Sequence, residues 1–478
     1  MGPENEAWPL TEKALALAQA DIAHGGEDYQ PYAVAAEILT TMAWWKKELT
    51  WRESANLDSA EIMAREMLEL DMLREAEDFL REAIRLNPSD SQLRAHLAHV
   101  LERQGPERRG EVLQILEQAR ATEPFDEGIA RMLANNLALR GQYERAMEEL
   151  ERFGALGEIS NGIRWRQLEI QQDYHAEDDR LELVLEMLTN EPDKFERVSA
   201  GLGHLYWVSS KMALLGLHEE SIALHNKLVT IPERADASDW EKWVRQFFLF
   251  DRYAFSVDEE GVHEANRRYL AKVEGLSNEE ILDRWYLEAV GIAQAFWAVG
   301  EHDRSIELFE ALRHHRIHPN WAQRAPELRL ELASRYLMEG RDAEAAPVVN
   351  EMVDMLEAEL AAGVRHPKTL YYLAQAYLWQ GHHDEAFEML SMAVDYGFDQ
   401  MGWKPPESAE TDEYDPFRHD WQALEDHRYQ EQLHRQEASV ERKAANIRAL
   451  LDSYDIDQLL APVIEVHAAS YHTVQSEP

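Results

Sequence analysis

The sequence has 478 residues, of which 45% are hydrophobic, 48 are Lys or Arg and 91 are Asp or Glu, so its formal net charge is −43. We expect no nucleic-acid or membrane partner, because proteins that bind phosphates or anionic lipids do so through clustered Lys and Arg. The chain contains no cysteine, which excludes disulfides, thiolate catalysis and cysteine-ligated metal sites. Solubility or adaptation to salt is the simplest explanation of the acidity, although an acidic surface also attracts basic partners.

The N-terminal stretch "MGPENEAWPLTEKALALAQA" is acidic and lacks a basic segment followed by an apolar one, so we expect no signal peptide. No window approaches the ~18 apolar residues that a membrane-spanning helix needs. Residues 1–56 are expected to form an N-terminal helical cap or a degenerate repeat.

Further along the chain, one spacing of large and small residues recurs. The stretch "AEDFLREAIRLNP" closes a first unit with Ala76, Leu80, Ala83 and Pro88. The full pattern follows at Leu133, Ala134, Leu137, Gly141, Ala146 and Leu150; at Ile292, Ala293, Phe296, Gly300, Ser305, Phe309 and Leu312; at Leu332, Ala333, Tyr336, Gly340, Ala345, Val349 and Met352; and at Leu373, Ala374, Tyr377, Gly381, Ala386, Leu390 and Ala393. Such self-similarity at a fixed period indicates a repeat architecture.

Each position in this pattern has a physical role. The small residue after the first large one, such as Ala374, lets a neighbouring helix cross closely. Gly381 and its counterparts permit the left-handed conformation that ends a helix. The small residue five positions later lets a second helix pack against the first, and Pro88 and Pro124 are expected to stop second helices.

The pattern resembles the tetratricopeptide repeat. Recognisable units lie near residues 57–90, 91–126, 127–160, 202–235, 286–320, 326–362 and 367–400, and residues 161–200 and 236–285 are helical in pattern but degenerate. Unit 91–126 departs from the family by an insertion at "GPERRGE", and the later units are longer than the family's usual length. The resemblance implies an all-α, right-handed superhelical solenoid over residues 57–400, with about nine helix–turn–helix pairs.

After residue 400 the pattern changes. Residues 401–416, "MGWKPPESAETDEYDP", are expected to form an acidic linker, residues 417–466 capping helices and residues 467–478 a tail. The stretches "AVDYGFDQMGW" and "DPFRHDWQALEDHRYQEQL" resemble the closing segment of tetratricopeptide domains in bacterial membrane-anchored winged-helix regulators and adenylate cyclases. The chain is then expected to be cytoplasmic if it is complete, and periplasmic if it is the outer domain of such a regulator.

The tetratricopeptide resemblance also implies a concave groove lined by the first helix of each pair. At the groove positions of the clear units, the acids Glu61, Glu69 and Glu102 balance the bases Arg65, Arg103 and Arg131, so the groove is not itself acidic. Aromatic, arginine and amide side chains are types that anchor peptide backbones and carboxylates. The candidate binding residues are Arg131, Asn135, Tyr206, Ser210, Gln294, Trp297, Ser334, Tyr371, Gln375 and Trp379.

Two alternatives apply to these positions. Trp297 and Trp379 would equally suit packing between repeats, and the apolar groove face of unit 326–362 would suit covering by another part of the chain. The aromatic segment Trp240–Phe255 has apolar residues on more than one helix face, which favours burial over docking.

We find no catalytic signature. Glu310, His314 and His318 follow one another at four-residue intervals, but on one helix the outer two would lie ~12 Å apart, too far to share a metal ion. No HExxH, GxSxG or Gly-rich phosphate loop occurs, so we expect no cofactor and no metal.

The sequence therefore predicts a non-catalytic scaffold or adaptor that binds a protein or peptide partner in its groove. The alternatives are the sensory or regulatory domain of a larger bacterial signalling protein and an enzyme with its site in residues 161–285. Self-association through the terminal helices is a further prediction, since the open end of a solenoid exposes apolar surface.

Overall fold

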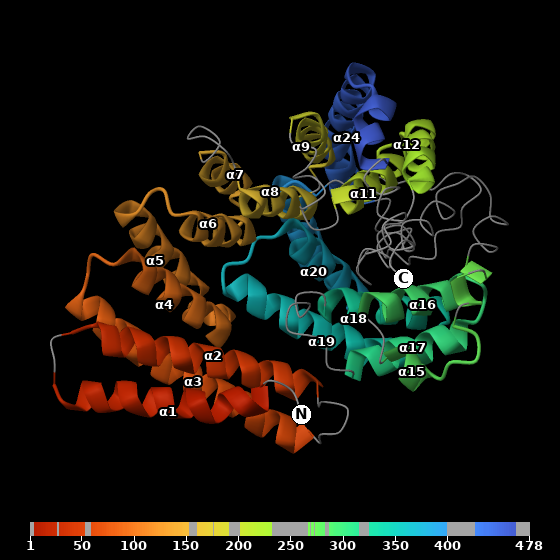
Figure 1. The fold of residues 1–478 in the computed structure, drawn as a ribbon. Coiled ribbons are helices and arrows are strands. Elements are labelled where there is room, and N and C mark those ends of the chain that lie inside the picture. Colours follow the sequence, from red (N-terminus) through yellow and green to blue (C-terminus); the bar gives the residue numbers. More distant parts are fainter. Residues whose placement is uncertain are drawn as a thin grey trace, which may run out of the picture. The chain divides into compact units, whose positions relative to one another are not determined.

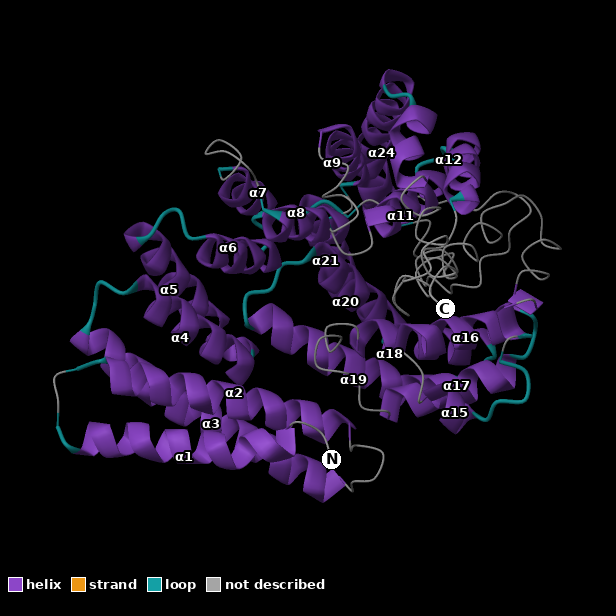
Figure 2. Ribbon diagram, in the orientation of Figure 1, coloured by secondary structure: helices purple, strands orange, loops and turns teal. Residues whose placement is uncertain are grey.

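The computed structural model describes residues 4–25, 28–52, 59–152, 160–174, 176–190, 201–231, 266–267, 269–271, 273–282, 286–314, 325–398 and 426–464. These residues form helices and connecting turns and contain no strand (Figure 2). The predicted all-α fold is confirmed. Within the same ranges, no helix is both long enough and apolar enough to cross a bilayer.

The helices before residue 160 are α1 (Glu4–Ala23), α2 (Gln30–Arg52), α3 (Ser59–Leu86), α4 (Ser91–Gln104), α5 (Arg109–Thr122), α6 (Glu127–Leu139) and α7 (Tyr143–Glu151), with a 3₁₀ turn at Pro106–Arg108 (Figure 1). The later helices are α8 (Asn161–Asp173), α9 (Glu177–Asn190), α11 (Gly201–Leu214), α12 (His218–Thr230), α15 (Asn278–Leu282), α16 (Tyr286–Ala298), α17 (His302–His314), α18 (Ala325–Met338), α19 (Asp342–Ala361), α20 (Pro367–Trp379), α21 (His383–Asp395) and α24 (His427–Ser453). Residues 456–464 are also helical.

The chain divides into two compact units. One comprises Met1–Ile159, Arg316–Gln323 and Glu357–Val364, and we call it the N-terminal unit. The other comprises Ser160–His315, Arg324–Leu356 and Arg365–Pro478, and we call it the C-terminal unit.

The N-terminal unit is a stack of antiparallel helix pairs. The pairs are α2 with α3, α4 with α5 and α6 with α7, while α3 also packs on α4 and α5 on α6. This arrangement is the nearest-neighbour stacking of a solenoid. The predicted helix–turn–helix unit at 57–90 is wrong, because these residues include one continuous helix, α3, whose partner is α2. No Gly or Pro interrupts the chain between residue 59 and Pro88, so nothing there favours a turn.

The C-terminal unit contains both adjacent and distant pairings. Adjacent helices pair as α11 with α12, α16 with α17 and α20 with α21, as expected for repeats. The long helix α24 packs both on α21, which precedes it, and on α9, which lies far back in the chain.

The predicted glycine positions end first helices as expected. Gly141, Gly300, Gly340 and Gly381 have φ angles of 75°, 84°, 67° and 77°. At the last of these, the Gly381 N–H bonds Leu378 O (2.9 Å) and the His382 N–H bonds Tyr377 O (2.8 Å), the two hydrogen bonds of a Schellman cap.

The small positions of the pattern also behave as predicted. Ala374 and Ala386 are buried, as are Ala333 and Ala345 in the preceding repeat. Where Ser305 replaces alanine, its hydroxyl donates to the Ala293 carbonyl oxygen at 2.6 Å and so joins α17 to α16. Helices α3 and α5 end at Leu86 and Thr122, each two residues before a proline, which confirms the predicted stops.

Several predictions fall outside the described residues. These are the degenerate segment 236–265 with the aromatic stretch Trp240–Phe255, the position of His318, the linker 401–416 and the tail 467–478. Of the predicted capping segment 417–466, α24 and residues 456–464 are described.

Candidate functional site

The N-terminal unit holds a pocket of about 430 Å³. Helices α2, α4 and α6 line it, and these are the first members of three consecutive helix pairs. The lining residues are Ala33, Glu37, Gln92, Leu93, Ala95, His96, His99, Asp126, Gly128, Ile129 and Met132. This is the inner helix layer on which the sequence predicts a groove.

The starts of α4 and α6 are fixed by aspartate caps. Asp90 accepts hydrogen bonds from the backbone N–H groups of Gln92 (3.0 Å) and Leu93, and Asp126 accepts from Ile129 N–H at 2.7 Å. These bonds satisfy N–H groups that a helix start leaves without partners. Because Gln92 Nε2 also donates to Asp126 at 2.7 Å, the two helix starts are joined at the rim of the pocket.

His96 connects α4 to α2. Its Nε2 lies 3.0 Å from the Thr40 hydroxyl, and that hydroxyl donates to Ala36 O at 2.8 Å. Its Nδ1 lies 3.5 Å from a carboxylate oxygen of Glu37, whose side chain is 71% exposed. Burial lowers the pKa of His96, and the negative charge of Glu37 only partly opposes this.

His99 lies one turn further along α4. Its ring is accessible to water, yet it stands in a concave surface where protein atoms replace part of its hydration shell. This partial burial lowers the pKa of His99, and the positive charges of Arg103 and Lys47 act in the same direction. The polar part of the pocket therefore consists of two imidazoles, the amide of Gln92 and two carboxylates.

The rest of the lining is aliphatic. Leu93 and Ile129 are buried, and Ala33, Ala95 and Met132 are half-buried. A pocket with an apolar floor and a few converging polar groups is typical of a ligand-binding site.

Two exposed aromatic side chains belong to the segments that contribute to the pocket. Trp44 is 53% exposed and lies seven residues after Glu37, on the same face of α2. Phe125 is 63% exposed and directly precedes Asp126 at the rim. Exposed aromatic side chains of this size are typical anchors in protein interfaces.

The two predicted groove residues of this unit lie beside the pocket but do not line it. Arg131 is exposed and lies 3.9 Å from Glu127, and its neighbour Met132 contributes to the pocket wall. Asn135 is half-buried on α6.

In the C-terminal unit, the predicted groove residues of the middle repeats take part in packing. Tyr206 is buried and its hydroxyl donates to Leu228 O at 3.0 Å. Gln294 donates to Glu331 at 3.0 Å, and Trp297 is buried with its ring stacked on His302, 4.1 Å between centroids. Ser210 lies in α11.

In the last two repeats, the predicted groove residues also take part in packing. The Ser334 hydroxyl donates to Leu330 O on its own helix at 2.7 Å. Tyr371 is buried under Phe398, with ring centroids 4.0 Å apart, and Gln375 is buried as well, while Trp379 is half-buried. The packing alternative is therefore correct for Trp297, and the segment after α21 covers the predicted groove face at Tyr371.

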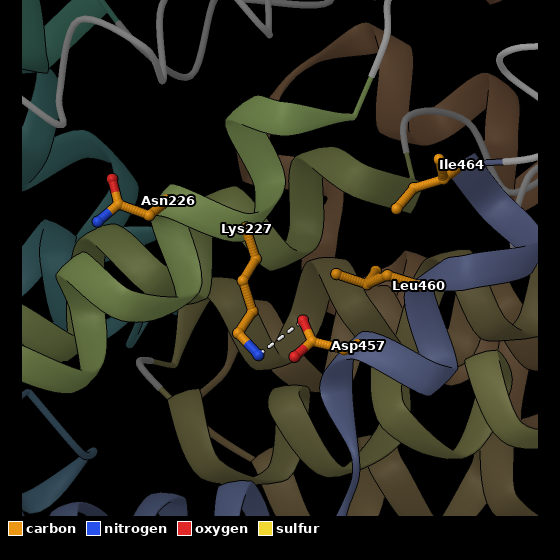
Figure 3. A pocket seen from close by; sticks show the side chains of 5 residues that line it. All are labelled: Asn226, Lys227, Asp457, Leu460 and Ile464. Carbon is orange, nitrogen blue, oxygen red and sulfur yellow. Dashed lines mark ion pairs between the residues drawn. The ribbon is translucent and has the colours of Figure 1, made fainter.

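A second hollow, of about 300 Å³, lies in the C-terminal unit between α12 and residues 456–464 (Figure 3). Asn226, Lys227, Asp457, Leu460 and Ile464 line it. Lys227 Nζ pairs with Asp457 at 2.7 Å, as Figure 3 shows, so its one cation and one anion neutralise each other. This hollow therefore presents fewer polar groups to a ligand than the pocket of the N-terminal unit.

None of the residues that line the pocket was among the candidate binding residues, and Glu37 and His96 are two of its polar residues that were missed. The repeat pattern does not extend to α2, so it predicts no groove positions there. Groove positions include the second residue before and the second residue after the first large residue of a unit, which is Leu97 on α4. This rule selects Ala95 and His99, both of which line the pocket, but omits His96. Counting α2 as the partner of α3 is the signal that would have identified Glu37.

Within the part of the chain that the structure describes, no group of three or more His, Asp or Glu side chains could hold a metal ion.

Comparison with known proteins assigns no family. No protein-family model matches the sequence, and no curated protein matches it. Among solved structures, the chain is similar to a human IFIT1 dimer with PPP-AAAA, at 14% identity and a TM-score of 0.33 over 83% of this chain and 88% of that one. It is also similar to a monomeric IFIT1 mutant with Gppp-AAAA, at 12% identity and a TM-score of 0.34 over 82% and 86% of the chains. A third similar structure is Naa15/Naa10 bound to HypK-THB, at 14% identity and a TM-score of 0.31 over 98% and 73%. Likeness at this level does not bear on what the chain binds.

Proposed function

We propose that this chain is a non-catalytic helical-repeat scaffold that binds an extended segment of a protein partner in the pocket between α2, α4 and α6. The observation that carries this proposal is the pocket of about 430 Å³ built from three consecutive first helices. A groove along such helices presents several rigid elements to one ligand, which suits a peptide that spans them.

The composition of the pocket supports a peptide rather than a nucleic acid. Its lining includes two carboxylates, Glu37 and Asp126, and no lysine or arginine. Phosphates would be repelled by this lining. Gln92, His96 and His99 supply neutral donors and acceptors for a peptide backbone, and Leu93 and Ile129 supply apolar contact.

The test is peptide binding by the full chain and by one variant with a filled pocket. A displayed library of random peptides is selected on the full chain, and selected peptides are synthesised with a fluorophore for anisotropy. Ala95→Phe places a large ring in the pocket and should weaken binding by about tenfold or more, since a buried aromatic group excludes the ligand.

The matched control is Ala121→Phe, at an exposed position on the second helix α5 of the same unit. This variant should bind like the unmodified chain, and circular dichroism should show that both variants melt like it. Equal binding by all three proteins would move the site away from this pocket.

A further inference from the structure

Large apolar side chains that face water are concentrated in the first three helices. Among the described residues, eight large hydrophobic side chains are exposed, and six of these belong to α1, α2 and α3. The six are Leu10 and Leu17 on α1, Val34 and Trp44 on α2, and Met67 and Leu68 on α3. Exposed apolar residues that gather in one region commonly mark an interaction site.

Helix α1 carries an apolar side that faces water. Leu10 is 70% exposed and Leu17 is 61% exposed. Ala14 lies between them and Asp21 follows them, and both are exposed as well. The four positions recur at intervals of four, three and four residues, so they lie on one side of the helix.

The opposite side of α1 already packs on α2. Ala18 is buried there, and Leu15 and Ile22 are half-buried. The ring of Trp8 lies 6.4 Å from that of Trp45 on α2, measured between centroids. A helix that is apolar on two opposite sides is normally covered on both, and in α1 the side with Leu17 is not.

Two charged side chains flank Leu17 symmetrically. Lys13 lies four residues before it and Asp21 four residues after it, and both are exposed. Within the described residues, neither of them forms an ion pair. This side of α1 therefore has no net charge, although the whole chain carries −43. A basic partner would find no excess of acid here.

We propose that this side of α1 packs antiparallel on the same side of α1 in a second copy of the chain, with the two Leu17 side chains in contact at a two-fold axis. A two-fold interface pairs one surface with itself, so the surface must be self-complementary. Lys13 and Asp21 each lie about 6 Å along the helix from Leu17, so the antiparallel arrangement brings Lys13 of each copy level with Asp21 of the other. Ala14 and Ala20 are small and allow the two helix axes to approach closely.

The charges select this arrangement over a parallel one. A parallel pair of α1 helices would place Lys13 beside Lys13 and Asp21 beside Asp21, and like charges side by side oppose association. The proposed dimer goes beyond peptide binding by one chain. Since no residue of α1 lines the pocket of the N-terminal unit, dimerisation would yield a scaffold with two available pockets.

Sedimentation equilibrium of the full chain, from about 1 μM to about 100 μM, measures the association. Because each copy carries −43, the experiment is done at about 150 mM salt, where the screening length of about 8 Å limits general repulsion. The expected result is a reversible equilibrium between monomer and dimer in this range.

Leu17→Glu tests the centre of the interface. It should raise the dissociation constant by about a hundredfold or more, because it sets two carboxylates against each other where two leucines packed. The matched control is Met338→Glu, at an exposed apolar position of α18 in the C-terminal unit, and it should associate like the unmodified chain. Both positions are exposed, so circular dichroism should show that both variants melt like the unmodified chain.

Charge reversal tests the antiparallel register. Lys13→Asp and Asp21→Lys should each raise the dissociation constant by about tenfold, because each turns two attractions across the axis into two repulsions. The double variant with both changes restores opposite charges across the axis and should dimerise like the unmodified chain.

The outcomes that contradict the proposal are specific. A monomer throughout the concentration range, or a dimer that Leu17→Glu leaves intact, would overturn the α1 interface. A dimer that Leu17→Glu abolishes but that the double charge reversal does not restore would overturn the antiparallel packing. None of these outcomes bears on the peptide pocket, which Ala95→Phe tests separately.

Discussion

Gly381 ends α20 with a φ of 77°, and a β-carbon built at this position has no atom within 4 Å. The demand for glycine is therefore purely conformational. Gly381→Ala should lower the free energy of unfolding by about 1 kcal/mol, the cost of placing an alanine in the left-handed region. Gly381→Asn is the matched variant and should cost less, because asparagine tolerates this conformation.

Urea unfolding of the three proteins measures these differences. An alanine variant as stable as the asparagine variant would mean that the backbone relaxes out of the left-handed region without cost.

Glu77 on α3 is the centre of an ion network with α4 and α5. It accepts hydrogen bonds from Arg81, Gln104 and Arg108. Burial opposes ionisation, but these hydrogen bonds outweigh it and lower the pKa of Glu77 from 4.5 to about 2. The 3₁₀ turn Pro106–Arg108, which is the insertion seen in the sequence, places the Arg108 guanidinium there.

The network makes stability depend on pH. Because the pKa of Glu77 is lower in the folded state, its contribution is complete above pH 4.5 and is lost as the pH falls through about 2. Glu77→Gln should cost about 2 kcal/mol at pH 7 and progressively less in acid. Glu82→Gln on the same helix, at a glutamate paired only with Arg85 at the surface, should cost close to nothing. A pH-independent cost of Glu77→Gln, measured by chemical unfolding, would contradict this account.

At the scale of elements, α24 is held to α9 by a buried ion pair. Lys443 Nζ lies 3.4 Å from Glu177 Oε2, and both side chains are buried. Burial raises the pKa of Glu177, although Lys443 opposes it. Lys443→Met should therefore destabilise the C-terminal unit by about 3–5 kcal/mol at pH 7, because it removes a positive charge that compensates the burial of the Glu177 carboxylate.

This loss should shrink in acid. A carboxyl group whose pKa is raised on folding costs stability above that pKa and stops costing it once protonated, so the Lys443→Met variant should recover stability as the pH falls. Lys227→Met, which breaks the exposed pair with Asp457, is the matched control and should cost less than about 1 kcal/mol. Thermal unfolding at pH 7 and pH 5 measures the stability of both variants. An equal loss of stability in Lys443→Met and Lys227→Met would show that the Lys443–Glu177 pair is not stabilising.

The sequence predicts the repeats well where each repeat is stabilised locally. Glycine and small residues at fixed offsets define the turns and the close helix crossings of residues 286–398, and both depend only on neighbours along the chain. The same reasoning predicts a complete helix–turn–helix unit at residues 57–90. It does so because α3 carries the spacing of a second helix, whereas its actual partner α2 does not carry the spacing of a first helix. Long-range contacts such as that of α24 with α9 produce no periodic pattern in the sequence, so the spacing of neighbouring residues does not predict them.

The candidate site was predictable only in part for the same reason. The spacing of groove positions identifies which face of a helix points inward, as at Ala95 and His99. It does not identify whether another segment covers that face. Phe398 covers Tyr371, and Trp297 contacts both His302 of its own repeat and Arg335 of the next one. Whether a groove position is free depends on segments distant in sequence.

At the scale of the whole molecule, the charge of −43 is spread over both units. Mutual repulsion of so many acids destabilises the folded chain at low ionic strength. Raising the salt concentration from about 10 mM to about 150 mM shortens the screening length from about 30 Å to about 8 Å, so the unfolding temperature should rise. Scanning calorimetry at the two concentrations tests this, and a fall in unfolding temperature would mean that individual ion pairs such as that of Arg108 with Glu77 outweigh the general repulsion.

The contact of α24 with α9 also has a consequence for biosynthesis. The pairs of the N-terminal unit join helices that leave the ribosome one after the other, so each pair can form as it emerges. Lys443 and Glu177 are 266 residues apart, and at ~5–20 residues per second the surface of α9 waits at least ~13 s for its partner. During that interval α9 exposes a face that the finished protein buries, and this face is where a chaperone would be expected to act on the nascent chain.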